Sequence, residues 1–240
     1  MSATDSLSND ILDVIYEDEW FAVINKAANF LSVPGKGEDK QDCVVSRAAN
    51  LFGEAHAVHR LDYATSGLML IAKTLDSHKI LSSHFRNRQI SKEYHALLRG
   101  HLIGNTGEVR KPMRCDWPNR PRQIICIDQW SKDAITLWEK VGYEDSIKNS
   151  SKNHTQSNPK NSSKNRTEGK NTRVRLMPFT GRSHQLRVHM QSIGHAIVGD
   201  EFYDNQCSPN DKRLLLHAYR LEFSHPITQA WVKFVAVCPF

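Results

Sequence analysis

The sequence has no long hydrophobic run, no C-x-x-C pair and no N-terminal signal. No apolar stretch in the 240 residues approaches the roughly 20 that cross a bilayer. Met1 to Asp5 are polar and acidic, so we expect no secretory signal peptide. The five cysteines are dispersed along the chain, which argues against a disulfide framework or zinc knuckle and indicates reduced thiols in a cytoplasmic protein.

Signatures of metal, nucleotide and serine-hydrolase sites are also missing. His184 and His189 are five residues apart, too far around a helix to share one ion, and no HExxH or cysteine cluster accompanies them. Ser66 lacks the G-x-S-x-G elbow. No glycine-rich loop marks a dinucleotide or nucleoside triphosphate site. We therefore expect neither a metal ion nor a cofactor.

The positive charge is concentrated in two segments. The chain has a net charge of +6 and a hydrophobic content of 39%, enough for the core of one large domain over residues 1–240. Residues 86–122 carry nine basic and three acidic side chains, and residues 146–173 carry seven and one, whereas the rest of the chain is acidic. Two basic segments on an acidic body predict a local binding surface for a polyanion.

Strands outnumber helices in the predicted secondary structure and do not alternate regularly with them. This pattern favours an α+β fold around a largely antiparallel sheet. Helices are predicted at 44–52, with Asp42 as a possible N-cap, at 76–88, capped by Asp76, and at 183–193. Strands are predicted at 11–16, 20–25, 67–73, 92–99, 123–128, 134–141, 173–179, 214–223 and 231–237.

Residues 146–172 break this pattern. They are mostly Ser, Asn, Lys, Thr, Gln and Gly, with Ile147 the one aliphatic residue, and cannot bury enough apolar surface to offset the entropy of ordering. We interpret them as a basic, disordered insertion within the domain. An inert spacer is favoured over a segment that binds nucleic acid nonspecifically.

The most informative segment runs from Val58 to Thr74 and contains one carboxylate, Asp62. Small polar residues and Gly67 lead from it into an apolar strand. A desolvated carboxylate at the mouth of a buried strand requires a partner or a function. The simpler interpretation is a turn aspartate that accepts hydrogen bonds from nearby backbone N–H groups.

A second segment supplies a candidate partner for that carboxylate. In a helix over 183–193, His184, Arg187 and Val188 share one face. A partly buried guanidinium among apolar neighbours needs a carboxylate, and its planar fork matches Asp62 bidentately. A surface helix with scattered basic residues is the alternative.

A third segment, the strand at 92–99, contributes an aromatic side chain. Alternation along the strand places Lys92 and Tyr94 on one side. A tyrosine can stack on a base, and its phenol can act as an acid or base. Ordinary half-buried sheet packing explains the same pattern.

Taken together, the three segments resemble the RluA-type pseudouridine synthases. The resemblance spans about Val14 to the C-terminus, and Ala27 departs from it because the family has Asn-Lys-Pro there. Too few residues precede the first strand for the S4-type RNA-binding module of other members. This favours the compact type that acts on both tRNA and 23S rRNA. The matching segments are His59-Arg60-Leu61-Asp62 with Thr65-Ser66-Gly67, Lys92-Glu93-Tyr94, Cys115 to Pro121, Gly181 to His189, and Leu214 to Ala218.

The resemblance implies a fold and an activity. The fold is an α+β domain with a largely antiparallel, mixed sheet, flanking helices and a central active-site cleft. The activity is isomerisation of uridine to pseudouridine in structured RNA loops, by base flipping and without a cofactor. The implied substrates are the anticodon stem-loop of tRNA and a stem-loop of 23S rRNA, and we expect a cytoplasmic monomer.

The resemblance also implies residue roles. Asp62 is the expected catalytic carboxylate, either attacking the sugar or removing a proton from it, and Arg187 keeps it ionised. Tyr94 is expected to stack on the uracil and assist proton transfer, and Arg60 to fill the space of the flipped base. Further substrate contacts are expected at His59, Thr65, Arg114, Arg120, Arg122, Arg182, His184 and Gln185.

Two other classes of function are weaker interpretations of the same residues. An RNA-binding protein without turnover is the main alternative, although Asp62, Tyr94 and Arg187 are all present. A glycosidase is disfavoured because no second carboxylate accompanies the first at a plausible position.

Overall fold

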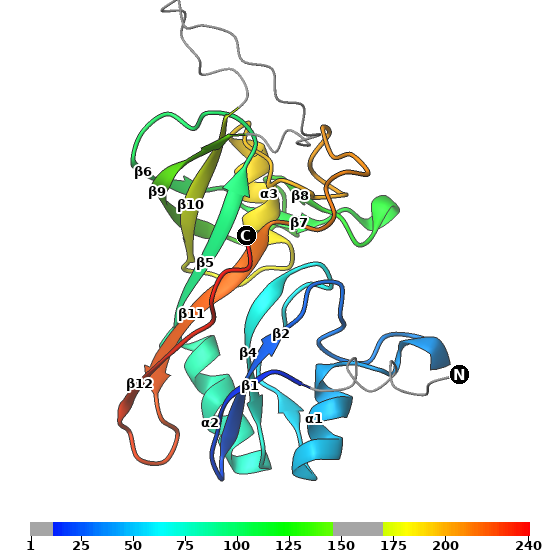
Figure 1. Cartoon of the computed structure of the whole chain (residues 1–240), viewed down its shortest axis with the longest axis vertical. Helices are drawn as coiled ribbons and strands as arrows, with labels where there is room; N and C mark the ends of the chain where they lie inside the picture. Colours follow the sequence, from blue (N-terminus) through cyan, green and yellow to red (C-terminus); the bar gives the residue numbers. More distant parts are fainter. Residues whose placement is uncertain (1–11, 146–169) are drawn as a thin grey trace, which may run out of the picture.

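A computed structural model describes residues 12–145 and 170–240 of the chain, which form three α-helices and a large twisted sheet (Figure 1). The helices are α1 (Val44–Phe52), α2 (Leu75–Arg86) and α3 (Gln185–Ser192), with short 3₁₀ turns at Glu38–Lys40 and Trp117–Asn119. The strands are β1 (Val14–Glu17), β2 (Phe21–Lys26), β3 (His56–Ala57), β4 (Ser66–Ala72), β5 (Ser91–Leu98), β6 (Thr106–Arg110), β7 (Met113–Cys115), β8 (Gln123–Ile125), β9 (Ile135–Asp145), β10 (Lys170–Pro178), β11 (Leu216–Ser224) and β12 (Trp231–Val235).

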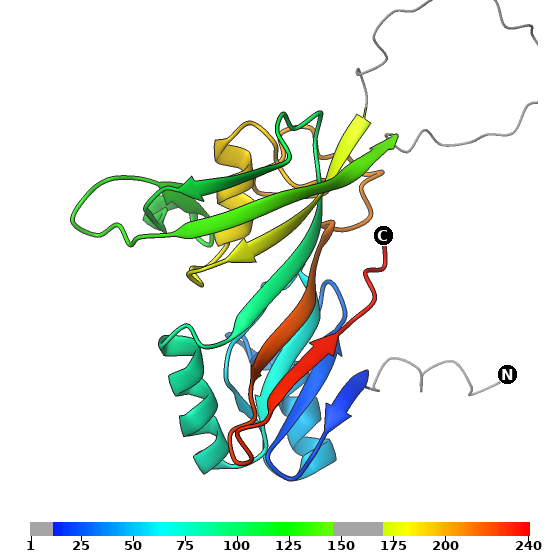
Figure 2. The ribbon, with the colours of Figure 1, turned by 90° about the vertical axis from the view of Figure 1, so that its left-hand side faces the viewer.

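The main sheet joins two halves of the molecule. Its strand order is β1-β2-β4-β11-β5-β10-β9-β6, with β12 added to β11 and β3 to β4. All of these pairs are antiparallel except β4 with β11. Strands β5 and β11 lie side by side and run from one half to the other (Figures 1 and 2). The predicted α+β fold with a largely antiparallel, mixed sheet is confirmed.

One half is built on β4, which is buried along its whole length. Because successive side chains of a strand point to opposite faces, Leu70 packs with Leu81 of α2, whereas Ile71 packs with Val44 of α1. The two helices therefore cover opposite faces of this half. Such two-sided burial explains why the strand is uniformly apolar in sequence.

The other half is built on β9, β10 and the upper part of β5. Leu186 and Met190 of α3 pack against Trp138 of β9 and Leu176 of β10. A separate two-stranded ribbon, β7 with β8, projects beside α3 (Figure 1). The active-site residues described below come from the junction between these halves.

The N-caps of α1 and α2 differ from the prediction by one or two residues. The N-cap of α1 is Cys43, whose Sγ accepts a hydrogen bond from Ser46 N at 3.3 Å, and not Asp42, which binds Arg47 instead. The N-cap of α2 is Thr74, not Asp76, which lies in the first turn of the helix. In both helices the side chain with the right backbone geometry precedes the first helical residue, as capping requires.

The third helix starts two residues later than the predicted 183. His184 has a left-handed backbone (φ 53°) and precedes α3, so it does not share a helical face with Arg187 as expected. Strand β10 begins at Lys170, so the expected insertion ends before residue 170 and not at 172. The rest of that segment, 146–169, lies outside the described residues.

Two observations on the described residues bear on the sequence predictions. All five cysteines are within the described part of the chain, and each is free. Within residues 12–145 and 170–240, no helix is long and apolar enough to cross a membrane.

Candidate active site

A cleft of about 1180 Å³ lies at the junction of the two halves. Its walls come from the turn before β4, the end of α2, the start of β5, the end of β10 and the start of α3. Nine of the predicted site residues line it: His59, Arg60, Asp62, Thr65, Tyr94, Arg182, His184, Gln185 and Arg187. The chain thus brings together segments more than a hundred residues apart.

The backbone on both sides of Asp62 is fixed by hydrogen bonds. Leu61 binds Ser32 through both backbone groups, because Ser32 Oγ donates to Leu61 O at 2.7 Å and accepts from Leu61 N at 3.1 Å. The Tyr63 carbonyl accepts from Nζ of Lys26 at 3.1 Å. Lys26 is 1% exposed and also donates to two other carbonyls. The carboxylate therefore projects from a rigid segment and remains 24% exposed toward the cleft.

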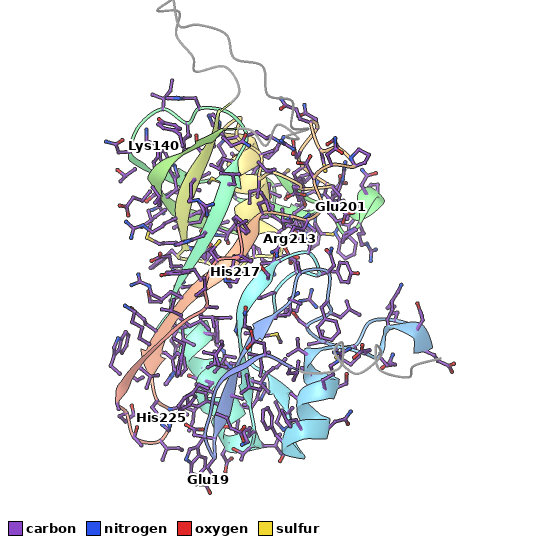
Figure 3. All side chains as sticks on the ribbon, viewed as in Figure 1. Glu19, Lys140, Glu201, Arg213, His217 and His225 are labelled. Atoms are coloured by element: carbon purple, nitrogen blue, oxygen red, sulfur yellow. The ribbon has the colours of Figure 1, made fainter. Side chains whose placement is uncertain are left out.

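Strand β4, which follows this turn, is locked to β11. Gly67 has φ 109°, and a Cβ there would overlap the Ala218 carbonyl oxygen, so only glycine fits this parallel pairing. Ser66 Oγ lies 2.8 Å from Nδ1 of His217 and accepts a hydrogen bond from Arg213, both labelled in Figure 3. Burial lowers the pKa of His217 to about 4, so this imidazole is neutral and structural at pH 7.

Arg187 makes the predicted contact with Asp62, but its bidentate partner is a different carboxylate. Its Nε and Nη2 donate to Asp200 at 2.8 and 2.7 Å, and its Nη1 lies 3.5 Å from Oδ2 of Asp62. Arg187 and Asp200 are 2% and 0% exposed. The prediction of a bidentate Asp62–Arg187 pair is therefore wrong, and the sequence analysis missed Asp200, which holds the guanidinium in place.

The electrostatics of this group keep Arg187 charged. Burial opposes its charge, but the hydrogen bonds to Asp200 and the attraction of Asp200 and Asp62 raise its pKa above the usual value. His184 Nε2 lies 3.9 Å from Oδ2 of Asp62, and its Nδ1 is 2.8 Å from Tyr203 OH. Burial lowers the pKa of His184, which favours the neutral imidazole beside the carboxylate.

Tyr94 presents an uncharged phenol to the cleft. Burial, and then the nearby charge of Asp62, raise the pKa of Tyr94, so the hydroxyl stays protonated at neutral pH. The hydroxyl has no hydrogen-bond partner in the described part of the chain. A phenol that lines the cleft and has a free donor is suited to contact a bound base.

His59 and Thr65 line the cleft but already serve the protein backbone. His59 Nε2 accepts a hydrogen bond from Leu70 N at 2.9 Å, and its ring stacks on Phe85 at 4.6 Å. Burial lowers the pKa of His59 to about 3. The N–H of Thr65 donates to the Asp62 carbonyl at 3.1 Å and closes the turn. Both residues shape the segment that carries the carboxylate.

Gln185, like His59 and Thr65, already makes hydrogen bonds within the protein. Its Oε1 accepts from Thr180 Oγ1 at 2.7 Å and from Arg182 N at 3.0 Å, and its Nε2 donates to Ile135 O at 2.9 Å. Arg182 is exposed at the rim, where its Nε donates to Asp133 O. Gln185 therefore holds the loop between β10 and α3, and Arg182 stays open to solvent.

Three predicted RNA contacts lie outside the cleft, on and beside the β7–β8 ribbon. Arg114 pairs with Asp128 at 2.6 Å. Arg120 stacks over the Trp117 ring at 3.9 Å. Arg122 lines a second, smaller cavity. The sequence did not show that the basic residues of 86–122 fall into two groups, one in the cleft and one on or beside the ribbon.

The cleft wall is strongly cationic. Asp62 is the single acidic side chain among the described residues that line it. The basic side chains in the lining are Arg60, Arg86, Arg88, Lys92, Arg182 and Arg187. This composition fits an anionic ligand that meets one carboxylate.

One group of potential metal ligands occurs elsewhere in the described structure. Asp204, Cys207 and Asp211 lie close together, but Arg99 donates to both carboxylates at 2.8 and 2.6 Å and neutralises them. His189 binds Thr136 and a backbone carbonyl. We make no metal proposal from either.

Comparisons with known proteins relate this chain to RNA pseudouridine synthases. The family model for RNA pseudouridylate synthase matches residues 20–192. The dual-specificity RNA pseudouridine synthase RluA of Pasteurella multocida (strain Pm70) is 42% identical over 94% of this chain and 92% of its own length. The protein of the same name from Escherichia coli (strain K12) is 39% identical over 95% and 94%.

A solved structure extends the comparison to the fold. Human RNA pseudouridylate synthase domain containing 1 superposes with a TM-score of 0.74 at 25% identity, over 96% of this chain and 85% of its own. The resemblance found in the sequence is thereby confirmed. The chain belongs to the RluA-type RNA pseudouridine synthase family, whose members are isomerases.

Proposed function

We propose that the enzyme converts uridines to pseudouridine in two RNA classes, the anticodon stem-loop of tRNA and a stem-loop of 23S rRNA. The support is the match to relatives named dual-specificity over nearly their whole length. A cationic cleft of about 1180 Å³ provides room for an unstacked nucleotide and its flanking phosphates. Loop uridines cost least to unstack, which fits stem-loop substrates.

We assign the catalytic role to Asp62. It is the single carboxylate in the described cleft lining, and it lies 3.5 Å from an arginine that Asp200 holds in position. This arrangement is the observation that carries the assignment. The adjacent guanidinium supplies a positive charge beside the carboxylate that attacks the sugar or removes a proton from it.

The reaction needs no external reagent. The C1′–N1 bond of uridine breaks, the uracil turns, a C1′–C5 bond forms, and the C5 proton leaves while N1 gains one. Substrate and product are isomers, so atoms and electrons balance without a cofactor.

We assign binding roles to Tyr94 and Arg60. Tyr94 lines the cleft with Asp62 and presents a protonated phenol, which supports stacking on the uracil and hydrogen-bond donation during proton transfer. Arg60, two residues before the carboxylate, is exposed at the cleft. We expect it to occupy the position that the flipped base leaves.

Pseudouridine mapping of total RNA, with and without the protein, tests this function. Pseudouridine has the same mass as uridine but is labelled by carbodiimide, so new labelled sites should appear in tRNA and in 23S rRNA. Sites in one RNA class alone would contradict dual specificity. RNA binding with no new site would favour the alternative of a binding protein without turnover.

A further inference from the structure

Lys92 is a cation without a partner inside the cleft. It lies on β5, half-buried, on the same side of the strand as Tyr94. Its ammonium makes no hydrogen bond or ion pair with any residue that the structure describes. Withdrawing an ammonium group from water without compensation is costly. The free protein therefore keeps this charge in an unfavourable place.

The neighbours of Lys92 make its position more unfavourable. Arg88, in the turn between α2 and β5, has its guanidinium 4.6 Å from the centre of the Phe179 ring and no carboxylate partner among the described residues. Arg182 donates to a neutral carbonyl. Burial, and then the charge of Arg88, lower the pKa of Lys92 to about 8. Like charges gathered without an acid are typical of a site for an anion.

The loop after β10 leaves this ammonium uncovered. Gly181 lies beside it, and a Cβ at that position would be 3.7 Å from Nζ of Lys92. Phe179 of the same loop is 52% exposed. Lys92 also lies two residues from Tyr94 along the strand, a distance of roughly 7 Å. A nucleotide whose base stacks on Tyr94 thus has its sugar–phosphate chain within reach of Lys92.

We propose that Lys92, together with Arg88 and Arg182, forms a phosphate subsite that binds the RNA backbone next to the target uridine. The proposal rests on the proposed function and names its phosphate-binding residues. Lys92 binds the phosphate directly, and the two arginines form the rim of the subsite. Neutralisation by the phosphate relieves the repulsion present in the free protein.

Salt-dependent binding tests this subsite. The RNA is an anticodon stem-loop that the wild-type enzyme converts, and affinity is measured in the Asp62→Asn background to prevent turnover. Lys92→Met should weaken binding roughly tenfold, as expected for one charged hydrogen bond, and should lower the slope of log affinity against log salt by about 1. Lys92→Arg keeps the charge and should retain most of the slope. Lys79→Met, on the exposed face of α2, is the matched control and should change neither.

A scan with single methylphosphonates locates the contact. Each substitution removes the charge of one phosphate around the target uridine. We expect one position at which the substitution weakens binding of the enzyme with Lys92 but does not further weaken binding of Lys92→Met. In the enzyme with Asp62 intact, the same RNA substitution should raise KM and change kcat little. Additive losses at every position, or an unchanged salt slope in Lys92→Met, would overturn the subsite. If the wild-type enzyme converts no uridine in any stem-loop, the proposed function itself fails, which separates the two failures.

Discussion

At the residue scale, the site consists of one carboxylate surrounded by cations. Asp62 contacts Arg187 at 3.5 Å, and Asp200 fixes Arg187 through two hydrogen bonds. Because the second carboxylate is fully buried, the guanidinium cannot move without leaving a charge unpaired. The position of Arg187 beside Asp62 therefore depends on a residue that does not line the cleft.

This dependence predicts the effect of Asp200→Asn. Breaking the buried pair should lower the free energy of unfolding by about 3–5 kcal/mol and kcat by roughly 100-fold, because Arg187 loses its position. Asp204→Asn is the matched control, since it breaks a buried pair with Arg99 away from the cleft. It should lower stability while kcat of the folded enzyme stays unchanged. Equal effects of the two variants on kcat would contradict a positioning role for Asp200.

The pKa of Lys92 predicts the pH dependence of RNA binding. Phosphate binds the charged ammonium, so affinity is full below the free-protein pKa of about 8 and falls as the pH rises through it. Between pH 7 and 9 the dissociation constant should rise about fivefold, because the neutral amine retains roughly a tenth of the affinity. The charged and titratable side chains that line the same cleft include Arg88, Arg182 and Asp62, together with His59, whose pKa is lowered to about 3 by burial and by the charge of Lys92, and Tyr94, whose pKa is raised.

The control for this pH dependence is Lys92→Arg, which stays charged across the range. It should flatten the profile, whereas titration of the RNA affects both proteins equally. Identical profiles for the two proteins would contradict the assignment of the pH dependence to Lys92.

The sequence predicted the Asp62–Arg187 contact from a general rule, that a buried arginine needs a carboxylate. It did not predict Asp200, which lies in an irregular loop after α3 and belongs to no periodic pattern. Arg114, Arg120 and Arg122 were predicted to contact the RNA, and this stays a prediction because all three lie outside the cleft lining. The distribution of charge along the sequence does not predict which basic side chains line the cleft after folding.

At the scale of elements, the pairing of β4 with β11 fixes the position of the turn that carries Asp62. Gly67 is required where β4 meets β11, because a Cβ there would overlap the Ala218 carbonyl oxygen. Gly53, at the end of α1, also has a positive φ but has open space around it. A substitution at Gly53 therefore tests the cost of the positive φ alone, whereas one at Gly67 also tests the cost of the close contact with β11.

Alanine substitutions should differ accordingly. Gly53→Ala should cost about 1 kcal/mol of unfolding free energy, the conformational term alone. Gly67→Ala should cost at least about 3 kcal/mol, because two strands must also move apart, and should lower activity. Urea denaturation measures both. Equal losses would show that the contact with β11 does not constrain this turn.

Elements with a long apolar run or a clear periodicity were predictable, whereas some short strands were not. The buried strand at β4 and the helices α1 and α2 were found within a few residues. The five-residue β6 and the three-residue β7 were missed, because neither has a clear alternation of apolar and polar residues. Cap residues were misplaced because an aspartate near each helix start competed with the true cap in the sequence.

At the scale of the whole molecule, the cleft is a product of topology. The single parallel pair, β4 with β11, places the turn that carries Asp62 beside β5, and β10 then leads to α3 and Arg187. This long-range arrangement followed from the family resemblance and not from local patterns. The monomeric state and the cytoplasmic location stay predictions.

The basic segment between β9 and β10 should be dispensable for catalysis. These strands pair from Asp145 with Lys170 onward, so a short Gly-Ser linker in place of residues 147–168 preserves the ladder. We expect kcat and KM on isolated stem-loops to stay close to wild type. Loss of turnover by the shortened protein would show that the segment belongs to the active enzyme.

The most direct test of the central claim is turnover and binding by Asp62→Asn on one uridine-containing stem-loop. We predict that carbodiimide labelling detects no pseudouridine, while the affinity for the RNA stays within a few-fold of wild type, because the change removes one charge and preserves the shape of the side chain. Pseudouridine formation near the wild-type rate would contradict the assignment of Asp62 as the catalytic carboxylate.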